Sequence, residues 1–109
     1  MSDFLQVQAA AGSRDEAERI AAALVDRRLA ACVQILGPVR SVYRWQGAVK
    51  EDEEWLCLIK TTRDRYRAVE DAIRQNHSYE CPEIIATPIE AGSAAYLRWL
   101  TEETQRGER

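Results

Sequence analysis

The alternation of two hydrophobic periodicities along the chain is the strongest constraint on its fold. Apolar residues recur at every second position in some segments, which is typical of strands, and every three to four positions in others, which is typical of helices. The predicted order is strand, helix, strand, strand, helix, strand, followed by one more helix. The predicted strands cover residues 4–10, 29–45 with one interruption, 55–59 and 84–89, and the helices begin near residues 13, 62 and 93.

The first helix has the clearest signals. Ser13 and Glu16 have the spacing of a capping box, in which each side chain bonds a free main-chain N–H group at the helix start. The following apolar residues share one helical face, because they recur at intervals of three and four. They are Ala17, Ile20, Ala21, Leu24 and Val25.

The second and third predicted strands form a long hairpin. Gly37-Pro38 interrupts the second strand, which predicts a bulge or bend on an edge strand because proline cannot donate to a ladder. Gln46-Gly47 has the composition of a turn. We interpret the charged run 50–54 as a solvated turn that precedes the apolar third strand.

The C-terminal half contains several boundary signals. Asn76 is predicted to end the second long helix as a left-handed cap, before a loop over residues 77–83. Pro88 indicates that the fourth strand ends at or near an edge. Ser93 is predicted to cap the final helix, and the polar tail 102–109 is expected to fray.

This order predicts an α+β fold, a ferredoxin-like split βαβ sandwich with a long hairpin between its second and third strands and an extra C-terminal helix. The 109 residues suit a single domain spanning positions 1–109. Short right-handed connections would place both main helices on one face of an antiparallel sheet. Because the third strand is apolar on both faces, we expect a second subunit to cover the other face.

Composition disfavours several classes of function. The net charge is −3 and the basic residues are scattered, so no positive track exists for nucleic acid. No apolar run could span a bilayer and no basic leader precedes one, which favours a cytoplasmic protein that does not bind membranes. The odd number of cysteines argues against a disulfide framework. They are Cys32, Cys57 and Cys81.

Catalytic motifs are not recognisable. The chain has one histidine, no Gly-x-Ser-x-Gly element, and five glycines that are isolated from one another. We therefore predict no catalytic residues, a protein that is not an enzyme, and no required cofactor.

Two residues in the 77–83 loop could ligate a soft or borderline metal. An imidazole from His77 and a thiolate from Cys81 suit Cu(I) or Zn²⁺. Two ligands make a weak site, so a tight site would need further ligands from another subunit. In the alternative interpretation, His77 follows a helix end and Cys81 packs as a small apolar residue.

Aromatic and acidic residues give two more candidate surfaces. Tyr43, Trp45 and Trp55 flank the predicted hairpin, where they would either pair across strands or anchor a subunit interface. Glu83, with Tyr79 nearby, could line a ligand pocket or hold the strand entrance.

Four segments carry motifs that match a known family in order and spacing. They are Leu29-Ala30-Ala31-Cys32-Val33, Tyr43-Arg44-Trp45-Gln46-Gly47, Lys60-Thr61-Thr62 and Tyr79-Glu80-Cys81-Pro82-Glu83. Together they resemble the CutA divalent-cation-tolerance family over about residues 10–100. The resemblance implies a ferredoxin-like fold, a tight homotrimer joined by long hairpins, and a role in tolerance of copper or another divalent cation.

The resemblance also implies a metal site, from which this chain departs. In the family, metal binding is associated with a first-strand cysteine and adjacent histidines after the second helix. Here residues 9–11 are alanines and Asn76 precedes His77, so Cys81 is the candidate replacement ligand.

Two functional hypotheses follow. The first is a metal-responsive trimer in which His77, with or without Cys81, contributes ligands near a subunit boundary. The second is a regulatory or scaffold trimer whose intersubunit cleft, around Lys60, Tyr79 and Glu83, binds a small anion or a protein partner.

Overall fold

Four antiparallel strands form the sheet in a computed structural model of the protein, which describes residues 2–105. Their order across the sheet is β2-β3-β1-β4. This order and the intervening helices confirm the predicted ferredoxin-like α+β fold. The strands are β1 (Phe4–Ala11), β2 (Cys32–Trp45), β3 (Ala48–Thr62) and β4 (Ile84–Pro88).

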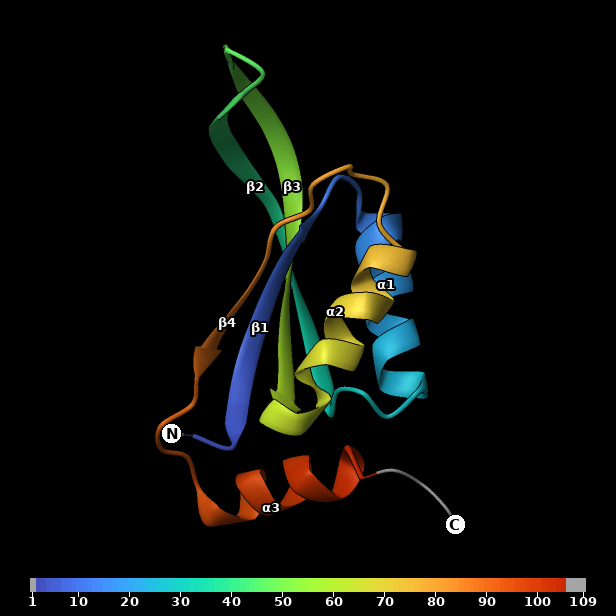
Figure 1. Cartoon of the computed structure of the whole chain (residues 1–109), viewed down its shortest axis with the longest axis vertical. Coiled ribbons are helices and arrows are strands. Elements are labelled where there is room, and N and C mark those ends of the chain that lie inside the picture. The colour runs from blue at the N-terminus through green and yellow to red at the C-terminus, as the bar shows by residue number, and fades with distance from the viewer. Residues whose placement is uncertain (1, 106–109) are drawn as a thin grey trace.

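The two main helices lie side by side on one face of this sheet, as predicted (Figure 1). They are α1 (Arg14–Asp26) and α2 (Tyr66–Gln75), the second preceded by a 3-10 turn at Arg63–Arg65. A third helix, α3 (Ala94–Glu103), lies across the end of the sheet opposite the hairpin tip (Figure 1). No helix in the described part of the chain is long and apolar enough to cross a membrane.

The core lies between the sheet and the two main helices. Alternate residues of β1 and β3 point into it, and the facing stripes of α1 and α2 meet them. The largest fully buried side chains include Val7, Ile20, Leu24, Ile59 and Ile73. Val25 was predicted to belong to the apolar face of α1 that packs on the core, but it is 44% exposed and lies outside the core.

Helix α1 is fixed at both ends by specific bonds. Ser13 Oγ accepts a hydrogen bond from the Glu16 N–H, as predicted, whereas the Glu16 carboxylate reaches back to Gly12 N–H instead of the cap residue. At the other end Arg28 is left-handed (φ 58°), and its guanidinium donates to the Glu102 carbonyl at the end of α3. Arg28 therefore ties α3 to α1.

The interruption in β2 is a bulge on an edge strand, as predicted. The register with β3 shifts between Leu36 and Val39, across the cis Gly37–Pro38 peptide. The hairpin turns at Gln46 and Gly47, whose φ values of 51° and 81° are the pair expected of a type I′ turn. The hairpin projects well beyond the rest of the sheet (Figure 1).

Two local predictions are wrong. Residues 50–54 belong to β3 and do not form a turn. The sequence pattern did not indicate a strand because residues 50–53 are charged and exposed on both faces of the projecting ribbon. Asn76 ends α2 without a left-handed conformation, at φ −111°, and its side chain instead donates to the Ala72 carbonyl.

The C-terminal helix only partly meets its prediction. Ser93 caps α3 by accepting from the Tyr96 N–H, as expected. Of the predicted apolar face only Leu100 is buried, while Tyr96 and Trp99 stay about 40% exposed. The tail 102–109 was predicted to fray. Residues 102–103 form the last residues of α3, and residues 106–109 lie outside the described residues.

Candidate functional site

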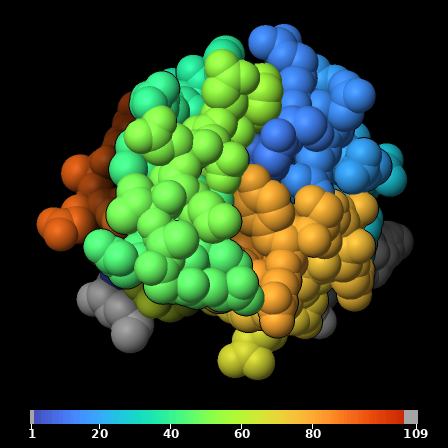
Figure 2. All heavy atoms as spheres, turned by 90° about the horizontal axis from the view of Figure 1, so that it is seen from above, coloured from blue at the N-terminus to red at the C-terminus, as the bar shows by residue number. Residues whose placement is uncertain are grey.

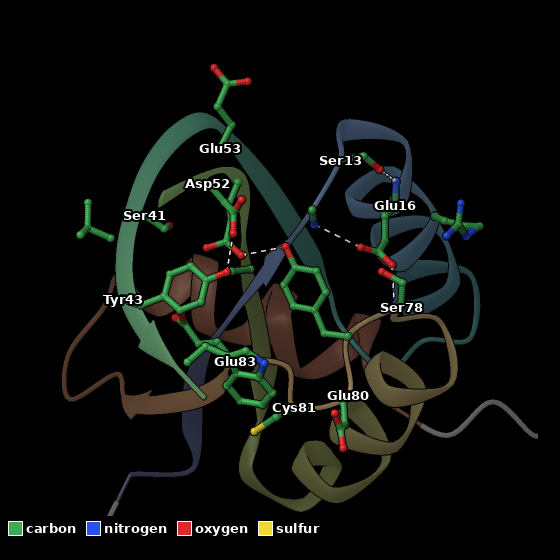
Figure 3. Close-up of a pocket in the computed structure, with 17 residues that line it drawn as sticks. Ser13, Glu16, Ser41, Tyr43, Asp52, Glu53, Ser78, Glu80, Cys81 and Glu83 are labelled. Carbon is green, nitrogen blue, oxygen red and sulfur yellow. Dashed lines mark hydrogen bonds between the residues drawn. The ribbon is translucent and has the colours of Figure 1, made fainter. Parts of the chain in front are cut away.

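A groove of about 1100 Å³ lies beside the hairpin, at the end of the sheet away from α3. Figure 2 looks down on this end, where the hairpin, the β1–α1 turn and the α2–β4 loop come together. Each of these segments contributes side chains to the groove (Figure 3). The groove therefore combines parts of the chain that are distant in sequence.

The groove is strongly acidic. Its lining includes six carboxylates and a single basic residue, Arg19. A concave surface lined by one sign of charge concentrates ions of the opposite sign. The acidic residues are Glu16, Asp52, Glu53, Glu54, Glu80 and Glu83.

Two tyrosine–carboxylate pairs stand on the hairpin wall. Tyr43 Oη donates to Asp52, toward which it points in Figure 3. Tyr79 Oη donates to Glu54 Oε2 at 3.0 Å. Burial, and then the bond to Glu54, raise the pKa of Tyr79 above its ordinary value. Tyr79 therefore stays protonated at neutral pH and remains a donor to Glu54.

Glu16 joins the two loops behind the groove. It is 4% exposed, and its carboxylate accepts from Gly12 N–H at 3.2 Å and from Ser78 N–H at 2.7 Å. Burial acts to raise the pKa of Glu16, but the hydrogen bonds from Ser78 and Gly12 together hold it below its ordinary value. Glu16 is thus an ionised anchor for the α2–β4 loop.

The ring of His77 is held between two main-chain groups. Nδ1 accepts from the Tyr79 N–H at 3.1 Å, and Nε2 lies 2.6 Å from the Ala10 carbonyl oxygen. A main-chain N–H can only donate and a carbonyl can only accept, so Nε2 carries the proton of a neutral ring. A metal could bind His77 only after one of these bonds is broken.

The second predicted ligand, Cys81, is exposed and lines the groove. His77 itself does not line it. Within residues 2–105, no three histidine, cysteine or acidic side chains are grouped in a way that could hold a metal ion. Burial raises the pKa of the Cys57 thiol to about 11, so Cys57 is an inert core residue.

The other predicted site residues divide between the groove and the rest of the molecule. Tyr79 and Glu83 line the groove, and Glu83 accepts from Gln8 Nε2 at 2.8 Å. Lys60 does not line it, because it lies six residues along β3 from Glu54, paired with Gln6 and Cys32, and its Nζ donates to Gln34 at 2.7 Å. The predicted cleft of Lys60, Tyr79 and Glu83 is therefore not assembled within one chain.

The three predicted interface aromatics also separate. Tyr43 and Trp45 are exposed on the hairpin and line the groove. Trp55 instead packs against the core, with its ring over Gly37. Trp55 Nε1 is buried and has no partner among the described residues.

Sequence reasoning missed Glu54 and Asp52 as groove residues. Both were assigned to a charged turn, whereas they project from one face of β3. No alternation of apolar and polar residues identified them, because residues 50–54 are all charged, and Glu53 lines the groove as well.

The fold and the groove define a small ferredoxin-like protein with a projecting hairpin and a cation-attracting groove. The chain belongs to the CutA1 divalent ion tolerance protein family, whose profile matches residues 5–103.

Curated relatives agree with this assignment. The divalent-cation tolerance protein CutA of Thermus thermophilus is 48% identical over 92 residues, covering 84% of this chain and 89% of the relative. The human protein CutA is 43% identical over 89 residues, covering 82% of this chain. The chain spans only 50% of the human relative but most of the Thermus one.

Solved structures share the fold. The divalent cation tolerance protein of Thermus thermophilus superimposes with a TM-score of 0.91 at 44% identity, covering 94% of this chain and 99% of that one. CutA of Xylella fastidiosa superimposes with a TM-score of 0.93 at 36% identity, covering 95% of this chain and all of that one.

Proposed function

We propose that this protein acts in divalent-cation tolerance as a trimeric, metal-responsive binding protein, with copper as the ion. The single observation that carries the proposal is the groove, whose lining includes six carboxylates and one basic residue, Arg19. Such a surface raises the local concentration of cations and repels anions. Membership of a family described by divalent ion tolerance supports the same direction.

The proposed soft ligand is Cys81. Its thiol is exposed and opens into the groove, and thiolates favour Cu(I). His77 would join it only by giving up a main-chain bond. We therefore propose that ligands from a neighbouring subunit complete the coordination of the ion.

The homotrimer is proposed from surface that one chain leaves uncovered. The open sheet face and the hairpin carry apolar side chains that water would otherwise contact. The edges of β2 and β4 also retain main-chain groups that a neighbouring chain could pair. The exposed apolar residues include Leu36 (49%), Val42 (59%), Val49 (59%) and Ile85 (52%).

We further propose that the protein is cytoplasmic and carries out no reaction of its own. The three cysteines are free, which suits a reducing compartment. Among structural relatives, the Archaeoglobus fulgidus protein is described as a periplasmic divalent cation tolerance protein. Fractionation of cells expressing the full chain tests the location directly.

The test combines solution mass with metal titration. Light scattering is expected to give three times the 12.4 kDa chain mass without metal. Calorimetry with Cu(I), Cu²⁺ and Zn²⁺ should show copper binding near micromolar or tighter, about −8 kcal/mol. Cys81→Ser should weaken Cu(I) binding at least about tenfold, whereas the matched control Cys32→Ser should not. A monomer, or equal loss in both variants, would contradict the proposal.

One observation favours a second candidate, a regulatory or scaffold trimer that binds a protein partner. Tyr43 and Trp45 stay about 40% exposed on the projecting hairpin, and such aromatics are frequent interface anchors. The small anion considered for this candidate is disfavoured, because the groove is acidic. A trimer that ignores all three ions would favour this candidate over the first.

A further inference from the structure

The proposed soft ligand, Cys81, lies in a stretch of the α2–β4 loop that no hydrogen bond fixes. Residues 80–82 form no hydrogen bond with any other residue of the described part of the chain. Of the main-chain groups of residues 78–83, only the Ser78 N–H bonds directly to another element within residues 2–105. The position of the Cys81 thiol at the groove therefore depends on how Ser78 is held.

The bond from Ser78 ends on a buried charge. Ser78 N–H donates to Glu16 Oε2 at 2.7 Å (Figure 3), and Gly12 N–H donates to Oε1 at 3.2 Å. Glu16 is 4% exposed, and a hydrogen bond to a charged acceptor is stronger where water is excluded. The anchor that follows Cys81 is weaker, since the side-chain bond to Glu83 is exposed to solvent.

Two other contacts hold the loop less directly. Tyr79 reaches Glu54 through the far end of its side chain, and His77 reaches the Ala10 carbonyl through its ring. Both contacts act through side chains of the loop, whose torsions can adjust, whereas Glu16 bonds the main chain itself.

The carboxylate of Glu16 is matched to both donors. It presents two acceptor oxygens, so it accepts the two N–H groups at once. A glutamine amide has one oxygen, and its NH2 group would face the other donor. An aspartate keeps the charge on a side chain one methylene shorter, and we expect it to reach only one donor. Both substitutions therefore break the link between the two loops, but only glutamine removes the charge.

We propose that Glu16 is a positioning residue that, through Ser78, holds the Cys81 thiol at the groove. The inference rests on the proposed copper response only for its effect on the ion. A loop that is already held in place saves the entropy of ordering the ligand when the ion binds. The placement of the thiol is tested without metal.

The acidic groove supplies a metal-free probe of this placement. A thiolate at the groove should react faster with a cationic reagent than with an anionic one, because the groove concentrates cations. The probes are two methanethiosulfonates, one with a trimethylammonium group and one with a sulfonate, from which the thiolate displaces methanesulfinate to form a disulfide. In a Cys32→Ser background, the ratio of the two rates should exceed that of 2-mercaptoethanol at least about tenfold. Cys57 does not compete, because burial raises the pKa of its thiol to about 11.

Glu16→Gln and Glu16→Asp should each lower this ratio at least about threefold, because the thiol is no longer held at the groove. Glu18→Gln is the matched control, since it removes the same charge from an exposed position of the same helix that does not line the groove. Its ratio should change less than about 1.5-fold. A fall in Glu16→Gln but not in Glu16→Asp would overturn the proposal, because the lost charge alone would then explain the result.

A measurement on the unaltered chain covers the case in which the variants do not fold. Nitrogen-15 relaxation should give the Ser78 amide an order parameter of about 0.85, the value of rigid backbone, and the Glu80 amide one below about 0.6. Equal order parameters at the two amides would overturn the proposal, because Ser78 would then hold nothing.

Copper binding separates this inference from the proposed function. In competition with a chromophoric Cu(I) chelator, Glu16→Asp should weaken binding about fivefold, while Glu18→Gln leaves it unchanged. A lowered reagent ratio with unchanged Cu(I) affinity would overturn the role of Glu16 toward the ion. A wild-type chain that binds no Cu(I) would reject the proposed function instead, and the reagent ratio would still decide the placement of Cys81.

Discussion

Gly12 lies directly against the ring of Tyr79. A β-carbon on residue 12 would stand 2.8 Å from the tyrosine oxygen and 3.2 Å from Cε1. The absence of a side chain at residue 12 is therefore what allows Tyr79 to cross the β1–α1 turn and reach Glu54 on the hairpin.

Gly12→Ala should destabilise the protein by about 1–3 kcal/mol, because the added methyl overpacks this contact and displaces Tyr79. Urea unfolding measures the change. In a Tyr79→Phe background the same substitution should cost less, since the closest clashing atom is gone. Strictly additive costs would show that the contact with the tyrosine oxygen is not the cause.

Gly37→Ala should cost more than Gly12→Ala. Its β-carbon would stand 2.4 Å from Trp55 Cδ1, and Trp55 is packed against the core. We expect a loss above about 3 kcal/mol, or failure to fold. Trp55→Leu should recover part of this loss in the double variant, measured by thermal unfolding. No recovery would place the strain in the backbone instead.

Glu16 should make stability depend on pH in the acid range. Because its folded pKa lies below the ordinary value of 4.5, its contribution is complete above that value and is lost as pH falls through the folded pKa. Glu16→Gln should cost about 1–3 kcal/mol at neutral pH and progressively less as the pH falls below about 4.5, by urea unfolding. The exposed Glu18→Gln on the same helix should show no such trend. A constant Glu16→Gln penalty would refute this role.

The hairpin turn can be tested without touching the core. Gln46 is left-handed at φ 51°, where asparagine is better tolerated, so Gln46→Asn should stabilise by up to about 1 kcal/mol. Gly47→Ala meets no atoms within 4 Å but must adopt φ 81°, and should cost about 1 kcal/mol. Thermal unfolding measures both changes. A higher midpoint for Gln46→Asn and a lower midpoint for Gly47→Ala would confirm the turn type.

The sequence predicted the helices and strands wherever burial follows a helical repeat or alternates along a strand. Ser13 and Ser93 cap the helices as expected, and the interruption at Gly37-Pro38 is the predicted bulge. The projecting part of β3 could not be predicted this way, because its charged residues 50–53 are exposed on both faces. The pattern of residues 50–54 thus resembles a turn although it belongs to a strand.

The groove was less predictable than the fold. Tyr79, Cys81 and Glu83 were identified, but Glu16 was expected only to cap a helix, and its bond to Ser78 joins positions 62 residues apart. Glu54 is 8% exposed and accepts from the Tyr79 hydroxyl, 25 residues away in sequence, which no local pattern encodes. Lys60 was assigned with Tyr79 to a cleft between subunits; within one chain the register places it opposite Gln6 and Cys32.

The exposure of the α2–β4 loop has a kinetic consequence. Residues 77–83 lie outside the helices and strands and are mostly exposed, and their bonds to Ala10, Glu16 and Glu54 are few. Segments with few buried apolar contacts open before the core does in the native state. We therefore expect amide hydrogens of residues 77–83 to exchange well before those of β1 and β3, so that the protein can admit a ligand to the groove while its sheet remains intact.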